Sequence, residues 1–144
     1  MLFFIMAAVG GNINVRFTYT YTGEEDIPDD VTHVIVRNIR VVLANAFADH
    51  PNIVEVIFHE KVEKIEENAF GDCPSMRRVI MRGVKIVEVF AFQDCEALTN
   101  VECGKLEIIK VGTFERCVSL RGINLPSARS VENMRLLSAP PLRI

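Results

Sequence analysis

Three cysteines and one histidine are the residues whose types and spacing could do chemistry. Cys73, Cys95 and Cys117 stand 22 residues apart, and His50 stands 23 residues before the first of them. A thiol beside an imidazole is the arrangement of a Cys–His nucleophile, and several thiols together can bind zinc. The sequence contains no C-x-x-C, H-E-x-x-H or G-x-S-x-G motif and no glycine-rich phosphate loop, which are local signatures of such sites. We therefore predict no catalytic residue, no cofactor and no metal.

The regular spacing of the cysteines indicates that they occupy one position of a repeat. They are then expected to form a row in the core, because free cysteine is among the most buried residue types. Apolar surroundings raise the pKa of a thiol and make it inert, so the row should hold reduced, structural thiols. A disulfide between neighbouring thiols, or a metal shared among them, is the alternative. Unpaired thiols in this number fit the cytoplasm better than an oxidising compartment, and a secreted or cell-surface location stays open.

Four phenylalanines mark the repeat that positions these residues. Phe47, Phe70, Phe92 and Phe114 are separated by 23, 22 and 22 residues. Aliphatic residues precede each of them by eight and five positions, apolar residues follow it by six, nine and eleven, and Cys or His follows it by three. A period of this length and fidelity indicates a solenoid. A single coil cannot bury its own apolar side chains, whereas stacked coils cover one another.

The repeat predicts the elements of each coil. Strands, each followed by a tight corner, are expected at five places: residues 31–37, 53–59, 76–82, 98–104 and 120–126. The segment through each phenylalanine, such as residues 66–73, has acidic and small residues and an apolar spacing typical of a short helical turn. The predicted fold class is an α/β repeat solenoid of about four to five coils of 22–23 residues, with short parallel strands and short helical turns.

The first 30 residues differ from the repeat. Residues 13–22 alternate apolar and polar side chains at the period of a strand, and Gly10-Gly11 before them is a hairpin turn signal. We therefore expect residues 1–30 to form a capping β-hairpin, with strands at 2–9 and 13–22, followed by an acidic entry loop. The alternative is that the apolar residues at the start are a leader.

The solenoid is expected over residues 31–131 and an irregular tail over residues 132–144. The pattern fades after Leu125, and the tail contains Pro140 and Pro141, which cannot donate to a strand ladder. Either the tail is an irregular cap or the chain is a fragment of a longer array. An uncovered apolar end would favour end-to-end self-association.

Composition and charge exclude several classes of function. Hydrophobic residues make up 49% of the chain and charged residues 24%, with a net charge of −3, which is typical of one globular domain. No block of Lys and Arg is present, so a nucleic-acid partner is not expected. No apolar run reaches the 18 or more residues of a membrane-spanning helix.

The alternation of the strands predicts a candidate partner-binding face. Positions eight, ten and twelve after each phenylalanine, and their equivalents in the first strand, should point outward. Ile35, Ile57 and Ile80 would then form an exposed apolar stripe. Charged or polar candidates flank this stripe: Arg37, His59, Arg78, Arg82 and Glu102. Apolar centres with charged rims mark interaction sites; the alternatives are that β-branched residues simply suit strands, or that the face assignment slips by one residue.

The repeat unit resembles a known family. The pattern V-x-x-I-x-x-x-A-F-x-x-C-x-x-φ-x-x-V-x-φ (φ is apolar), seen at residues 62–81, is similar to the BspA-like, or surface-antigen, type of leucine-rich repeat. The resemblance covers roughly residues 31–131, and the entry at residues 20–36 is similar to the entry of such repeats in microalgal proteins. This sequence departs from the pattern at His50, at Thr113 and in the last repeat.

The resemblance implies a right-handed leucine-rich-repeat solenoid that binds other proteins and carries no catalytic residues. The first hypothesis is therefore a non-catalytic module that binds a protein partner through its strand face. The second is a structural or adhesive surface protein that self-associates through an uncapped end of the stack. Assembly that depends on protein concentration would separate the second hypothesis from the first.

Overall fold

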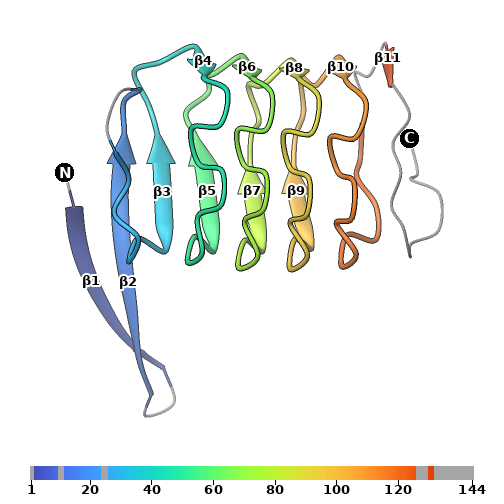
Figure 1. Ribbon diagram of the computed structural model, residues 1–144. Coiled ribbons are helices and arrows are strands. Elements are labelled where there is room, and N and C mark those ends of the chain that lie inside the picture. Colours follow the sequence, from blue (N-terminus) through green and yellow to red (C-terminus); the bar gives the residue numbers. More distant parts are fainter. Residues whose placement is uncertain (1, 10–11, 24–25, 126–129, 132–144) are drawn as a thin grey trace.

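The structure is a computed structural model that describes residues 2–9, 12–23, 26–125 and 130–131, with side chains from residue 17 to residue 125. Within these residues the chain winds into successive coils stacked side by side (Figure 1), which confirms the predicted solenoid. The expected Gly10-Gly11 turn and the expected tail at 132–144 lie outside the described residues.

Two sheets form opposite sides of the stack. The larger sheet has the order β1 (Leu2–Val9), β2 (Asn12–Tyr21), β3 (His33–Val36), β5 (Glu55–Phe58), β7 (Arg78–Ile80) and β9 (Asn100–Glu102). The smaller sheet has the order β11 (Ser130–Val131), β10 (Ile108–Ile109), β8 (Ile86–Val87), β6 (Lys64–Ile65) and β4 (Val41–Val42). All neighbouring strands are parallel except β1 and β2.

The register of the larger sheet follows the repeat. Val34, Val56, Val79 and Val101 are in-register neighbours across β3, β5, β7 and β9. The first three are buried at 0–1% exposure and Val101 packs against the core. The 23-residue spacing between the first two phenylalanines leaves the register intact, because the extra residue lies in the corner after β5.

The predicted strand at residues 120–126 is wrong within its described part, since residues 120–125 are in no strand. The thiol of Cys103 does donate to the carbonyl of Asn124 at 3.3 Å, so this segment lies beside the end of β9. Gly122 and Asn124 occupy it, and both residue types disfavour strands.

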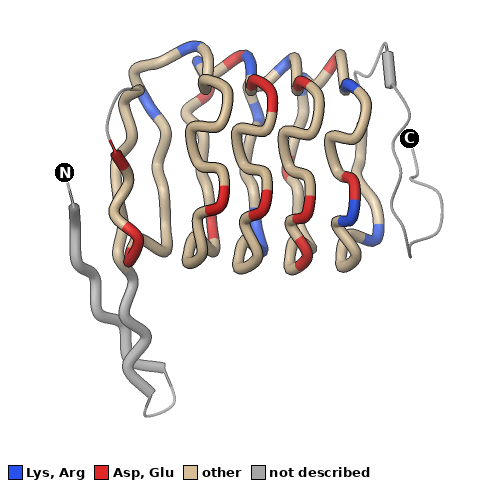
Figure 2. Tube along the Cα trace, in the orientation of Figure 1, with Lys and Arg blue, Asp and Glu red and all other residues tan. Residues whose placement is uncertain are grey.

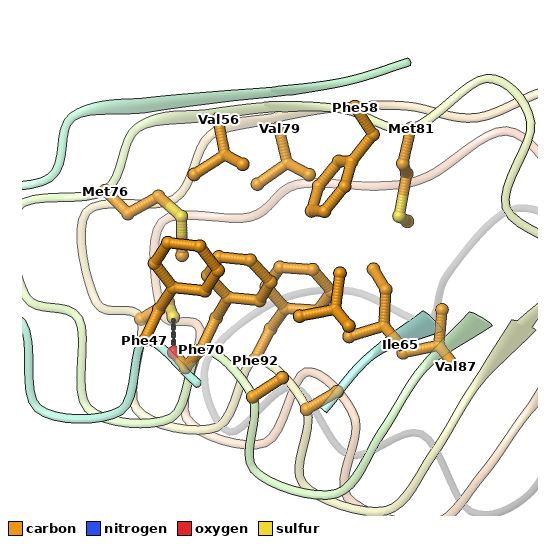
Figure 3. Packing of buried hydrophobic residues seen from close by; sticks show 14 of the residues in the cluster. Phe47, Val56, Phe58, Ile65, Phe70, Met76, Val79, Met81, Val87 and Phe92 are labelled. Atoms are coloured by element: carbon orange, nitrogen blue, oxygen red, sulfur yellow. Dashed lines mark hydrogen bonds between the residues drawn. The ribbon is translucent and has the colours of Figure 1, made fainter. Parts of the chain in front are cut away.

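The phenylalanines form the centre of the core. Neighbouring rings from Phe47 to Phe114 stack nearly parallel, with centroids 4.6, 5.2 and 5.5 Å apart and interplanar angles of 7°, 6° and 11°. Figure 3 shows the rings of Phe47, Phe70 and Phe92 in a row, with side chains of both sheets beside them. All four rings are at most 2% exposed, which confirms the alignment of the repeat on these residues.

The expected helical turns are wrong, and with them the α/β assignment: no helix occurs among the described residues. Every second amide closes a turn, and in the first coil Ala46, Ala48 and His50 donate to the carbonyl three residues earlier. The amides between them donate to the next coil, at 3.1, 2.7 and 2.8 Å for Asn45, Phe47 and Asp49. A helix would use all of these amides internally and leave none to join the coils. The fold is a parallel β-solenoid of about four turns.

The predicted N-terminal hairpin is present. β1 pairs antiparallel with β2 from Leu2 opposite Tyr19 to Val9 opposite Asn12. The last four residues of β2 also pair in parallel with β3. Tyr21 is buried and its ring meets Phe47 edge-on at 4.7 Å, so β2 covers the first ring of the stack.

Candidate partner-binding face

The row of cysteines is part of the scaffold. Cys73, Cys95 and Cys117 are fully buried and free, and each thiol donates to the backbone carbonyl of the phenylalanine one coil earlier, at 3.1, 3.1 and 3.0 Å. The neighbouring thiols of Cys117 and Cys73, together with burial, raise the pKa of Cys95 well above its usual value. The Cys95 thiol therefore stays protonated. The hydrogen bonds of all three thiols tie adjacent coils together.

His50 takes the place of cysteine in the first coil and has a related structural role. The imidazole is 6% exposed; its Nε2 donates to the carbonyl of Pro28 at 2.9 Å, and its Nδ1 accepts from the amides of Asn52 and Ile53 at 3.3 Å. Both ring nitrogens are therefore engaged with backbone, so His50 does not serve Cys73 as a general base. Within the described residues, no three His, Cys, Asp or Glu side chains are arranged to hold a metal ion.

The outward face of the larger sheet carries the predicted apolar stripe only in part. Ile35, Ile57 and Ile80 are in register across β3, β5 and β7. Ile57 is 36% exposed and Ile35 is half-buried, but Ile80 is only 8% exposed. The inward and outward sides are as predicted, and the expected exposure of Ile80 is wrong.

A group of ion pairs flanks the buried Ile80. Arg78 bonds Glu55 at 3.3 Å and Glu102 at 2.6 Å, and Arg82 bonds Glu102 at 2.9 Å. Ile80 lies between Arg78 and Arg82 along the chain and opposite Glu102 in the register, so the ion-paired residues flank it. Hydrogen bonds from Arg78 and Arg82 lower the pKa of Glu102 below its usual value. We call these four charged residues the paired half of the face.

The other half of the face has exposed basic side chains without ion-pair partners among the described residues. Arg37 and His59 are exposed, and neither has an ion-pair partner among the described residues. The Nδ1 of His59 accepts from the amide of Lys61 at 3.3 Å, which leaves Nε2 as the nitrogen that can carry the ring proton. We call Ile35, Arg37, Ile57 and His59 the open half of the face.

A hollow of about 550 Å³ adjoins the open half at the corners after β3 and β5, and it was missed in the sequence. Its lining consists of Asn38, Ile39, Arg40, His59 and Lys61. The sequence did contain a signal for this hollow, because the corners after β3 and β5 both carry basic residues close to an outward-facing strand position. Which corner residues share a hollow depends on the stacking of the first two coils, which periodicity alone does not place.

The fold and this face define a solenoid repeat protein in which a parallel sheet presents side chains to the solvent. A family model described as the BspA type leucine rich repeat region matches residues 29–136 in six copies. The chain belongs to this family of leucine-rich repeats. No curated protein matches the chain.

Two solved structures resemble the chain. One is a leucine rich cell surface protein from Faecalibacterium prausnitzii, at 20% identity and a TM-score of 0.52, with 97% of this chain and 43% of that chain covered. The other is a leucine rich repeat protein from T. pallidum, at 18% identity and a TM-score of 0.46, with 86% of this chain and 69% of that chain covered. The first likeness supports the fold, and this chain spans less than half the length of that protein.

The described part of the chain includes no helix of the length and apolarity needed to cross a membrane.

The thiol of Cys103, which follows β9, differs from the buried row of cysteines because it is only half-buried. Burial raises its pKa to about 11, so it too is protonated near neutral pH.

Proposed function

We propose that this chain is a non-catalytic module that binds a protein partner through the outward face of its larger sheet. The observation that carries the proposal is Ile57, which is 36% exposed in the middle of a strand and is followed two residues later by the exposed His59. Apolar centres with polar rims are typical of protein interfaces. Leucine-rich repeats of this kind suit protein partners because stacked coils present a broad, continuous surface.

The chemistry of the described residues favours binding over catalysis. The three thiols of the buried row donate to carbonyls, and a protonated thiol is a weak nucleophile. His50 is held by backbone groups on both ring nitrogens. The proposed site comprises the open half of the face, bordered by Arg78, Ile80, Arg82 and Glu102.

A second candidate is a structural or adhesive surface protein that self-associates end to end. The observation that favours it is the resemblance to a leucine rich cell surface protein. Parallel strands at the end of a stack can pair with another chain. Analytical ultracentrifugation over a range of concentrations tests it, and a sedimentation coefficient independent of concentration would contradict it.

The proposal is tested by affinity capture from the lysate of the source organism. The parent is compared with Ile35→Glu/Ile57→Glu, which places charges on the open half; Ile80 is left unchanged because it is buried. Val118→Glu is the control, since Val118 is 43% exposed and lies outside this sheet. We expect a protein retained by the parent and by the control and lost by the double variant. Equal recovery by all three folded proteins would place the site on another surface.

A further inference from the structure

The two halves of the strand face differ in charge as well as in exposure. In the paired half, two arginines are bonded to two glutamates. In the open half and its corners, four basic side chains have no ion-pair partner among the described residues: Arg37, Arg40, His59 and Lys61. Glu60, which follows His59 in sequence, does not line the hollow. The open half therefore carries a local positive charge on a protein whose net charge is −3.

These basic groups converge on one hollow. Arg40 comes from the corner after β3, and His59 and Lys61 come from the corner after β5. The bond from the amide of Lys61 to Nδ1 of His59 fixes the ring, so that Nε2 is available to donate a hydrogen bond. A guanidinium, an ammonium and an imidazole N–H provide donors suited to a carboxylate.

An apolar contact point lies close to this hollow. Ile57 precedes His59 by two residues on the same side of the strand, which corresponds to about 7 Å along the chain. Ile35 occupies the equivalent position beside it. A ligand that contacts both Ile57 and the hollow must carry an apolar group about 7 Å from a negative group, which is the length of two residues in a strand.

We infer that the hollow and the open half together bind an acidic segment of a partner protein, with a carboxylate among Arg40, His59 and Lys61 and an apolar side chain on Ile57. This inference rests on the proposed function and names the chemistry of the partner. The paired half disfavours the same segment, because Glu55 and Glu102 already occupy its arginines. An acidic segment is thereby directed to the first two coils.

Acidic residues elsewhere on the molecule make a second copy of this chain a competing occupant of the hollow. The experiment must distinguish that occupant from a partner protein. Figure 2 shows acidic residues along the lower turns of successive coils, whereas at the upper edge Lys and Arg alternate with Asp and Glu. Asp49, Asp72 and Asp94 share one position of the repeat, and burial together with the neighbouring carboxylates of Asp94 and Asp49 raises the pKa of Asp72. The acidic turns of a second copy could therefore also meet the basic hollow.

The test uses the full chain and a short synthetic peptide in which pairs of acidic residues alternate with leucine. A matched peptide with Gln and Asn in place of Glu and Asp is the reference probe. We expect the acidic peptide to shift the NMR signals of amides at residues 35–40 and 57–61, and to leave those at 78–82 and 100–102 in place. We expect Arg40→Gln/Lys61→Gln to weaken binding about tenfold. Ile57→Glu should weaken it as well.

The control variant is Lys105→Gln/Arg121→Gln, which removes the same charge from exposed residues of later coils, outside the proposed site. Its affinity for the acidic peptide should stay within about twofold of the parent. Equal weakening by both double variants would mean non-specific attraction and would overturn the inference. So would equal binding of the two peptides, or the absence of any shift at millimolar peptide.

Three further outcomes distinguish this inference from competing explanations of the binding. Displacement of the peptide by millimolar inorganic phosphate, with no effect of Ile57→Glu, would identify a general anion site and overturn the partner class. Concentration-dependent dimers that Arg40→Gln/Lys61→Gln abolishes would identify a second copy as the occupant, which also overturns it. A lysate partner lost by Ile35→Glu/Ile57→Glu but kept by Arg40→Gln/Lys61→Gln would leave the proposed function standing and overturn only this inference.

Discussion

The turn segments that contain the phenylalanines, here called the turn side, and the outward strand face of this solenoid differ in how strictly their residue types repeat. On the turn side the same residue type recurs in successive coils, as with the stacked rings from Phe47 to Phe114. On the strand face one column reads Ile35, Ile57, Ile80 and Glu102. A buried row must pack against its own copies at the spacing of the coils, so changing one member disturbs two interfaces. An outward column has no such constraint, and its chemistry can differ from coil to coil.

The largest expected effect breaks the buried row. Phe70→Ala removes a ring that is fully buried and stacks on Phe47 and Phe92, and it should lower the free energy of unfolding by about 3–5 kcal/mol. Ile57→Ala on the strand face should cost less than about 1 kcal/mol. Urea denaturation of both variants measures the difference. Similar midpoints for the two would contradict the distinction between the two sides.

The row of buried cysteine thiols is expected to contribute less to the stability of the fold than the row of phenylalanine rings. Cys95→Ala leaves the carbonyl of Phe70 without its thiol donor, and an unsatisfied buried acceptor costs about 1–3 kcal/mol. Cys95→Ser should recover part of the loss, because a hydroxyl can donate to the same carbonyl. Urea denaturation of both variants tests this. A serine variant less stable than the alanine variant would show that the thiol acts by packing alone.

The sequence predicted the features that follow from the period of the repeat, and it missed the features that depend on which side chains of neighbouring coils meet. The offsets from each phenylalanine located the register and the outward position of Ile57. They could not show that Ile80 is covered, because that depends on Arg78, Arg82 and Glu102 meeting across β7 and β9. The hollow at Arg40 was missed for the same reason, since its lining comes from two coils.

The helical turns were predicted because apolar spacing alone does not separate a helix from a run of stacked turns. A signal against a helix was present in the residue types at two repeat positions. Asn45 and Asn68 have φ of 60° and 54°, and Asp49 and Asp72 have φ of 62° and 55°. Asn and Asp are the side chains that best tolerate this left-handed conformation, and their recurrence marks where a helix cannot continue.

An intermediate effect tests this difference between turn and helix. Asn68 has positive φ, and its side-chain amide donates to Oδ1 of Asn45 at 2.8 Å. Asn68→Ala should destabilise the protein by about 1 kcal/mol, because alanine disfavours this conformation and makes no such bond. Asn68→Gly should be less harmful, because glycine adopts positive φ freely. In a helix the order would be reversed, so thermal unfolding of the two variants decides between the structures.

The smallest expected effect on stability concerns Glu102, whose substitution should make the paired half resemble the open half. Arg78 and Arg82 lower the pKa of Glu102 below its usual value of 4.5. The ion pairs therefore stabilise the folded state above the unfolded pKa, and this contribution is lost as the pH falls through the folded value. Glu102→Gln should remove that part of the acid dependence and change neutral stability little, since exposed ion pairs contribute little. Acid titration of unfolding measures this.

The same substitution has a larger expected effect on binding than on stability. Without the carboxylate of Glu102, Arg82 loses its ion-pair partner and Arg78 keeps only Glu55. The acidic peptide should then shift amides at residues 78–82 as well as those at 57–61, with an affinity gain of about two- to fivefold. Gln keeps the size of the side chain, so Ile80 should stay covered and the gain should come from charge alone. If the peptide still bound only the first two coils, exposure of Ile57 rather than free cations would direct it there.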